Sequence, residues 1–127
     1  MEYESVVDSS VVLAFIRQES GGEQMQAHFS RTLMSAVNFC EVAGKLYEDG
    51  YSTDEIRMLF SDLGISIAPV DTELAIEAGA LRPETRHLCL SLGDRFCLAL
   101  GRRSGLPVYT ADRRWAKLSG MDIRLIR

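Results

Sequence analysis

The chain has 127 residues, of which 46% are hydrophobic and 25% charged, and its net charge at pH 7 is −4. This length and apolar content predict a single domain, residues 1–127, whose core needs no disulfide or metal staple. The sequence has no apolar run near the roughly 20 residues that span a bilayer, and its acidic start is unlike a secretory leader, so we expect a cytoplasmic protein without membrane contact. The spacing of its three cysteines and two histidines indicates neither a disulfide framework nor a zinc site.

The first part of the chain predicts strands that alternate with helices. A strand is expected over residues 4–7, with Asp8 at its end and with Ser9 or Ser10 capping a helix that continues to about Gln18. The elements expected next are a turn at residues 21–22, a short helix, a strand over residues 33–37, a helix over residues 37–49, a helix from Thr53 to Gly64, a strand over residues 65–70 and a helix from Asp71 or Thr72 to Ala80.

Residues 89–112 predict a buried helix followed by a buried strand. Ser91 is the expected N-cap of this helix, and Asp94 lies in its first turn. The strand is expected over residues 106–109, and Asp112 follows its carboxyl end. The remaining expected elements are a polar connection over residues 82–86, a short helix over residues 113–118 and a last strand over residues 123–126.

Charge is spread unevenly along the chain. Residues 1–85 carry 5 Lys and Arg against 15 Asp and Glu, whereas residues 86–127 carry 9 against 3. A basic C-terminal third favours a positive surface that holds a polyanion. It is equally consistent with an acidic part and a basic part that pair with each other or with a partner, and the sequence leaves both interpretations open.

The alternation of elements predicts an α/β fold of three layers, in which a central parallel sheet is flanked by helices. The carboxyl ends of parallel strands meet at one edge of a sheet, where ligands bind. Asp8 and Asp112 follow strands, Asp94 opens a helix, and Glu41 lies near the start of a helix on its apolar face. We therefore expect these four acids to converge at that edge.

Converging carboxylates need something that offsets their repulsion, which is roughly 4 kcal/mol for a pair about 4 Å apart at an effective dielectric constant of 20. Either some of the acids hold protons at neutral pH, or a hard divalent cation takes the charge. Oxygen ligands favour Mg²⁺ or Mn²⁺ over Zn²⁺, and such a cation activates a water against a phosphodiester. Ser9 and Thr110 could add hydroxyls to this site, and Asn38 could orient Glu41 or a water.

Each of these residues also has an ordinary structural interpretation. The acids can cap helices, complement a helix dipole or lie at the edge of an amphipathic helix. Ser9, Asn38 and Thr110 are common capping or turn residues, which makes a local role the expected one for each of them alone. Cys40 and Cys97 are expected in the core.

Four segments resemble the PIN-domain ribonucleases and, within them, the single-domain VapC-type toxins of prokaryotic toxin–antitoxin pairs. The segments are VVDSSVVLAFI around Asp8, SAVNFCEVAGKL around Glu41, AGALRPETR over residues 78–86, and LSLGDRFCLALGRRSGLPVYTAD, which contains Asp94 and Asp112. Together they cover nearly the whole chain, and their order and spacing are more specific than any one of them.

The resemblance implies a PIN-like fold and a site in which the four acids bind Mg²⁺ or Mn²⁺, with Ser9 and Thr110 as supporting hydroxyls. It also implies a homodimer, cleavage of single-stranded RNA and a small antitoxin protein that blocks the site. Basic residues of the C-terminal third would fit contacts with phosphate or with an acidic antitoxin; these are Arg95, Arg102, Arg103, Arg113, Arg114 and Lys117.

Other classes of α/β domain fit less of the sequence. A phospho-accepting receiver domain needs an acidic pair after its first strand, but Asp8 is followed by Ser9 and Ser10. A haloacid-dehalogenase-type phosphatase needs an aspartate two residues after Asp8, where Ser10 stands. A non-catalytic domain that keeps the fold and binds a partner through its charged faces is the alternative to the nuclease.

Overall fold

The computed structural model describes residues 2–127, and at its centre is a sheet of five parallel strands in the order β3-β2-β1-β4-β5. The strands are β1 (Ser5–Val7), β2 (Thr32–Ser35), β3 (Ser66–Ala68), β4 (Val108–Thr110) and β5 (Ile123–Leu125). β1 lies in the middle of the sheet, where Val6 pairs with Leu33 of β2 and with Val108 of β4. The predicted parallel sheet is confirmed.

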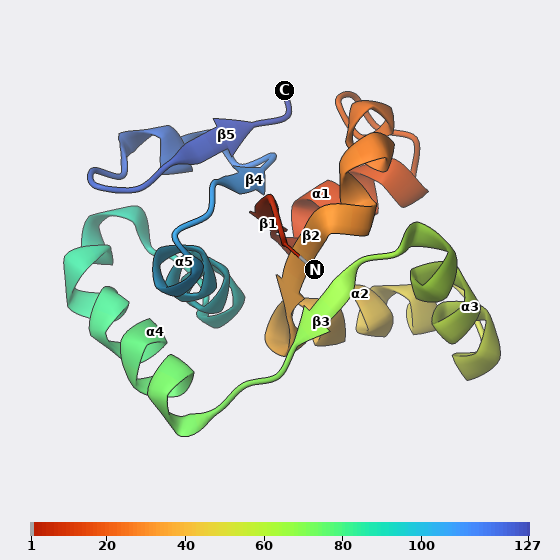
Figure 1. Cartoon of the computed structure of the whole chain (residues 1–127), viewed down its shortest axis with the longest axis horizontal. Coiled ribbons are helices and arrows are strands. Elements are labelled where there is room, and N and C mark those ends of the chain that lie inside the picture. Colours follow the sequence, from red (N-terminus) through yellow and green to blue (C-terminus); the bar gives the residue numbers. More distant parts are fainter. Residues whose placement is uncertain (1) are drawn as a thin grey trace.

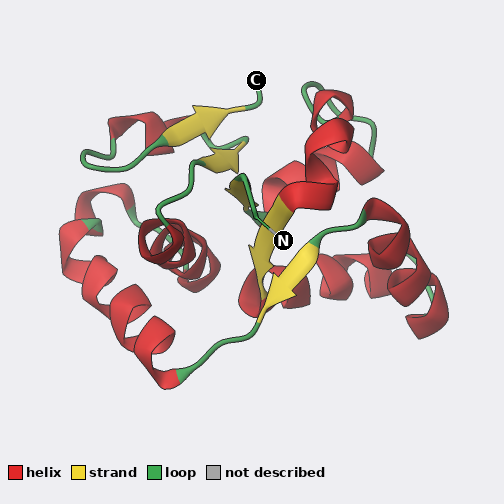
Figure 2. Cartoon of the chain, in the orientation of Figure 1, coloured by secondary structure: helices red, strands yellow, loops and turns green. Residues whose placement is uncertain are grey.

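Helices cover both faces of the sheet, which confirms the predicted three-layer architecture. The α-helices are α1 (Ser9–Ile16), α2 (Ala36–Glu48), α3 (Thr53–Leu63), α4 (Thr72–Glu84) and α5 (Leu92–Ser104), and the 3₁₀ helices are η1 (Glu23–Arg31), η2 (Arg86–Leu88) and η3 (Arg113–Lys117). α4 and α5 lie on one side of the sheet, and α1, α2 and α3 lie on the other (Figure 1). Figure 2 shows the strands between these two groups of helices. In residues 2–127, no helix is both long enough and apolar enough to cross a membrane.

Two apolar cores hold β1 in place from opposite sides, because successive side chains of a strand point to opposite faces. Val7 packs in the core that includes Phe29 and Leu46, whereas Val6 packs in the core that includes Leu98 and Trp115. All six side chains are essentially inaccessible to solvent. The position of Asp8, which directly follows β1, is therefore set by packing on both faces of the sheet.

The first helix differs from the prediction at both ends. Asp8, rather than Ser9 or Ser10, is its N-cap, because Asp8 has extended backbone angles and its carboxylate accepts a hydrogen bond from the N–H of Val11. The helix ends at Ile16, before the expected Gln18. β2 and β3 also end earlier than expected, at residues 35 and 68.

The polar connection expected over residues 82–86 is wrong in its first part, because α4 continues through Glu84 with Pro83 in its last turn. The helix ends at Thr85, whose hydroxyl donates to the carbonyl of Leu81 at 2.8 Å. The backbone N–H of Thr85 donates to the same carbonyl at 3.0 Å, so the last turn of the helix closes beyond the polar residues that suggested a loop.

The buried face of α2 explains why one cysteine prediction is wrong. Asn38, Val42 and Leu46 are the buried residues of this helix, and their spacing of four places them on one face. Cys40 lies two positions from Asn38, on the opposite face, and is exposed, whereas Cys97 in α5 is buried as predicted. Glu41, expected on the apolar face, is also exposed.

Candidate functional site

A cleft, here called the carboxyl-edge cleft, opens at the carboxyl ends of β1 and β4. Its volume is about 310 Å³, and its walls include all four predicted acids, which come from four separate elements: Asp8, Glu41, Asp94 and Asp112. From β1 the chain adds β2 and β3 on one side of the sheet and then crosses to add β4 and β5 on the other, so the order of strands reverses between β1 and β4. Ligands bind at this kind of crossing point in open parallel sheets.

Asp8 is the most buried of the four acids, with 4% of its surface exposed. Its Oδ1 accepts from the hydroxyl of Ser10 at 2.6 Å and from the N–H of Val11 at 3.2 Å, and its Oδ2 accepts from the hydroxyl of Thr110 at 2.6 Å. The Ser10 oxygen also accepts from the N–H of Ala111 at 2.9 Å. These bonds connect the ends of β1 and β4 and hold the Asp8 carboxylate in one orientation.

Burial raises the pKa of Asp8 from 3.8 to about 6, because the ionised carboxylate loses its hydration. Hydrogen bonds from Ser10 and Thr110 lower this pKa, and the charge of Asp94 raises it slightly further. Asp8 therefore takes up a proton only a little below neutral pH. Protonation of some acids was one of the two ways of relieving carboxylate repulsion that the sequence left open, and the raised pKa of Asp8 makes this acid easier to protonate.

Glu41 is exposed, but its carboxylate is oriented by other parts of the chain. Its Oε1 accepts from the hydroxyl of Ser9 at 2.8 Å and from Nδ2 of Asn38 at 3.1 Å. Asn38 is buried, and its side chain also donates to the carbonyl of Gly93 at 3.1 Å and accepts from the hydroxyl of Ser35 at 2.6 Å. Asn38 thus links α2 to α5 and orients Glu41, as the sequence suggested.

Gly93 leaves the space that the Glu41 carboxylate occupies. A Cβ at position 93 would lie 2.2 Å from Oε1 of Glu41, so a larger residue there would displace the carboxylate. Asp94 follows directly, and its Oδ2 accepts from the N–H of Ser91 at 3.0 Å while the Ser91 hydroxyl accepts from the N–H of Asp94 at 3.1 Å. This capping box fixes the start of α5 and confirms Ser91 as its N-cap.

Asp112 is held by one arginine. Nη2 of Arg114 lies 2.6 Å from Oδ2, and Nε lies 3.0 Å from Oδ1 and 3.2 Å from Oδ2. Hydrogen bonds from Arg114 hold the pKa of Asp112 below its ordinary value. Arg114, expected to contact phosphate or an antitoxin, is paired in this structure with a predicted site residue.

Three residues hold the acids in ways that were not predicted: Ser10, expected only as a possible cap, Arg114, expected to contact phosphate or an antitoxin, and Gly93. Glycine is unfavourable in the first turn of a helix, so Gly93 beside Asp94 was a usable signal of a close approach by another group. No comparable signal marked Ser10 or Arg114. Ser9 and Thr110 do more than cap locally, because they donate to acids 32 and 102 positions away in the sequence.

The basic residues of the C-terminal third do not all face the cleft. Arg102 lies 3.3 Å from Glu84, and Arg103 lies 3.2 Å from Asp71, so both form ion pairs beside α4. For these two arginines the structure agrees with an acidic part and a basic part that pair with each other. The positive charges in the walls of the carboxyl-edge cleft belong to Arg17, Lys45 and Arg127.

The donor groups of this cleft are suited to a hard cation. They are carboxylate and hydroxyl oxygens, which Mg²⁺ and Mn²⁺ prefer. Cys97 lies one turn beyond Asp94, and burial, followed by the charges of the nearby acids, raises the pKa of its thiol well above the ordinary value, so it stays protonated. Among residues 2–127, no three Asp, Glu, His or Cys side chains are grouped closely enough to hold a metal ion as they stand. The donor chemistry fits, and the acids would have to close around a cation.

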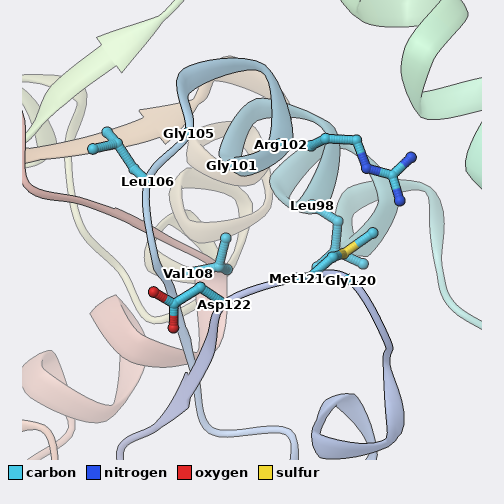
Figure 3. Close-up of a pocket in the computed structure, with 9 residues that line it drawn as sticks. All are labelled: Leu98, Gly101, Arg102, Gly105, Leu106, Val108, Gly120, Met121 and Asp122. Atoms are coloured by element: carbon cyan, nitrogen blue, oxygen red, sulfur yellow. The ribbon is translucent and has the colours of Figure 1, made fainter.

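A second cleft, here called the amino-edge cleft, has a volume of about 250 Å³ and lies where the end of α5 meets the starts of β4 and β5 (Figure 3). Most of its lining is glycine or apolar: Leu98, Gly101, Arg102, Gly105, Leu106, Val108, Gly120, Met121 and Asp122. It lies at the opposite edge of the sheet from the four acids.

The fold and the carboxyl-edge cleft define a class of protein, an α/β domain in which four carboxylates line a cleft at the carboxyl edge of a parallel sheet. Residues 5–121 match the family described as PIN domain, and the chain belongs to this family. The predicted resemblance to PIN domains is thereby confirmed. The receiver and dehalogenase alternatives are not supported, since they belong to other families.

Solved structures share this fold over almost their whole length. A toxin–antitoxin complex from Klebsiella pneumoniae has 20% identity, a TM-score of 0.76 and coverage of 98% of each chain. VapC20 from Mycobacterium tuberculosis, described as a Sarcin-Ricin loop cleaving toxin, has 15% identity, a TM-score of 0.73 and coverage of 93% of this chain and 96% of that chain. DNA-bound VapBC from Salmonella typhimurium has 19% identity, a TM-score of 0.69 and coverage of 98% and 99%. No curated protein sequence matches the chain.

Proposed function

We propose that the chain is a divalent-metal-dependent endoribonuclease that cleaves single-stranded RNA and acts as the VapC-type toxin of a toxin–antitoxin pair. The observation that carries this proposal is the meeting of four carboxylates from separate elements in the carboxyl-edge cleft. Membership of the PIN domain family supports it, and so does the presence of toxin–antitoxin complexes among the similar structures. We take residues 1–127 as one PIN-like domain that works in the cytoplasm.

In this proposal the four acids hold Mg²⁺ or Mn²⁺, and the hydroxyls of Ser9 and Thr110 support them. A cation bound there would polarise the scissile phosphate and activate a water for attack. Asn38 and Ser9 orient Glu41 through the hydrogen bonds at 3.1 and 2.8 Å. Asp8 has to lose its proton before it can bind a cation, because a protonated carboxyl is a poor ligand.

The RNA backbone would be attracted by the positive side chains in the wall of the cleft. Arg17 and Lys45 line the same hollow as the acids. Phosphate contacts of this kind give affinity without reading sequence, and they weaken as salt is added. The choice among RNAs would then depend on the shape of the surrounding loops.

Cleavage of a fluorogenic single-stranded RNA by the purified protein tests the proposal. We expect hydrolysis with added Mg²⁺ or Mn²⁺, none with excess chelator, and a large loss in Glu41→Gln. Glu48→Gln removes the same charge from the exposed far end of α2 and should leave the rate unchanged. Activity that survives chelation would contradict metal dependence, and RNA binding without cleavage under every metal would favour the non-catalytic alternative.

The proposed homodimer has a candidate surface on α4 and α5, which pack against each other. Ile76 and Leu92 are large apolar side chains on these helices, yet 59% and 57% of their surfaces are exposed. We propose that a partner copy covers both side chains in the dimer, where they would form one apolar contact surface. Light scattering should give twice the mass of one chain, and Ile76→Glu should lower it to one.

The proposed antitoxin partner can be tested by expression in cells. Induction of the chain alone should arrest growth, and induction of Asp94→Asn should not. Co-expression with the small protein encoded beside it should restore growth and yield a stable complex. Normal growth on induction of the soluble, RNA-cleaving chain would contradict the toxin role while leaving the nuclease intact.

A further inference from the structure

The contact between Arg114 and Asp112 occupies most of the hydrogen-bonding capacity of a proposed metal ligand. A carboxylate has about four lone-pair positions for hydrogen bonds or metal coordination. The Arg114 side chain makes three contacts with the two oxygens, at 2.6, 3.0 and 3.2 Å, and its backbone N–H donates a further bond to Oδ1 at 3.0 Å. A cation that coordinates Asp112 therefore has to displace at least part of this contact.

Arg114 is also anchored at its other end. Its Nη1 donates to the carbonyl of Leu88 at 3.1 Å, in the turn that ends η2. The guanidinium thus bridges the segment after β4 and the segment before α5. Because two separate contacts orient its planar group, Arg114 holds the Asp112 carboxylate in a defined position.

The charge of Arg114 matters as much as its geometry. Within residues 2–127, the ion pair between Arg114 and Asp112 is the only one that involves any of the four acids of the carboxyl-edge cleft. A positive group fixed on one of these carboxylates offsets part of their mutual repulsion. The same positive group repels a divalent cation that approaches the same carboxylate.

We propose that Arg114 is a positioning residue that competes with a divalent cation for the Asp112 carboxylate and thereby sets the cation affinity of the carboxyl-edge cleft. This inference rests on the proposed function, because it assumes that Asp112 is a metal ligand. Arg114 keeps Asp112 in place without a cation and releases part of the Asp112 carboxylate when one binds. The affinity for the cation is lower than four carboxylates alone would give.

Calorimetric titration with Mn²⁺ measures this competition without any RNA. Arg114→Gln removes the positive charge and the two-nitrogen contact, and we expect it to tighten Mn²⁺ binding about tenfold, since a repulsive charge a few ångströms from the cation is gone. The matched control is Arg113→Gln, the same change at an exposed neighbouring residue, which should alter the affinity by less than about twofold. The effect of Arg114→Gln should disappear in an Asp112→Asn background.

The outcomes separate this inference from the proposed function. If the native chain binds Mn²⁺ through the acids and loses it in Asp94→Asn, but Arg114→Gln binds no more tightly, the competition is wrong and the metal site stands. If Arg114→Gln binds Mn²⁺ and the native chain does not, Arg114 competes with the cation strongly enough to exclude it, which supports the inference. If neither protein binds Mn²⁺, both ideas are wrong.

A second readout follows the arginine directly. In a ¹⁵N–¹H spectrum, the Nε–H signal of Arg114, identified by its absence in Arg114→Gln, should shift as Mg²⁺ is added to the native chain. In Asp112→Asn the same signal should not respond to Mg²⁺. A signal in the native chain that is insensitive to saturating Mg²⁺ would contradict the displacement.

Discussion

The carboxyl-edge cleft and the amino-edge cleft lie at opposite ends of β4 and α5, yet they are built in different ways. Two acids of the first are bonded to residues from distant segments: Asp8 accepts from Thr110 across 102 positions, and Glu41 accepts from Ser9 across 32. The charged residues of the second, Arg102 and Asp122, pair with surface partners at 3.3 and 3.2 Å. A hollow alone does not make a site. The carboxyl-edge cleft differs because four carboxylates line it, one of them is buried Asp8, and the charge of Asp94 raises the pKa of Asp8.

The largest expected difference between the clefts is in activity. Asp94→Asn keeps the capping interaction with Ser91 but removes a proposed ligand charge, so RNA cleavage should fall by more than about 100-fold, the upper range for loss of outer-shell support. Asp122→Asn makes the same change in the amino-edge cleft, where the aspartate is more than half exposed and paired with Arg124. RNA cleavage by Asp122→Asn should match that of the native chain. Equal losses in both variants would contradict the assignment of the activity to the carboxyl-edge cleft.

Asp8 should make the carboxyl-edge cleft a source of instability at neutral pH. Its pKa is raised from 3.8 to about 6, so the native state binds this proton more tightly than the unfolded state does. Keeping Asp8 ionised in the folded state costs folding free energy. This cost is absent below about pH 3.8, grows between pH 3.8 and about pH 6, and is complete above that. In chelator at about pH 8, Asp8→Asn should therefore raise the free energy of unfolding by up to about 3 kcal/mol. At about pH 4, denaturant unfolding should show almost no difference between Asp8→Asn and the native chain. A gain in stability of equal size at both pH values would mean that ionisation of Asp8 is not its cause.

Replacing a glycine beside each cleft by alanine should have different effects, and Gly93 lies beside the carboxyl-edge cleft. In Gly93→Ala the new Cβ would meet the flexible end of Glu41 at 2.2 Å, so the carboxylate should move at little cost in stability. We expect RNA cleavage and Mn²⁺ affinity to fall roughly 10-fold to 100-fold while thermal unfolding changes little. Gly79→Ala on α4 has open space around its Cβ and serves as the control. Unchanged metal affinity in Gly93→Ala would show that the position of Glu41 is not critical.

The smallest expected effect is a stability change at the amino-edge cleft. In Gly101→Ala the new Cβ would lie 2.3 Å from Cγ2 of Val108, a buried β-branched side chain with few rotamers. Overpacking of this kind costs about 1–3 kcal/mol, which denaturant unfolding would measure. RNA cleavage by the folded variant should be unchanged. A loss of cleavage in the folded variant would mean that the two ends of α5 are coupled.

Local sequence determined the order of the elements and the positions of the acids relative to them. The alternation of apolar runs predicted the parallel sheet, and Asp8, Asp94 and Asp112 were recognisable because each directly ends a strand or opens a helix. Element ends were less predictable. The last turn of α4 closes where Thr85 donates to the carbonyl of Leu81, and this contact exists only in the folded helix.

Only the tertiary structure decided which side chains meet. The contact of Arg114 with the carbonyl of Leu88, the fit of Glu41 against Gly93 and the bond from the N–H of Ala111 to the Ser10 hydroxyl depend on how segments pack across the sheet. Periodicity and capping describe neighbours along the chain, and they carry no information on contacts between residues far apart in sequence. The sequence by itself therefore determined where the acids stand along the chain, and packing on both faces of β1 decided how they are held.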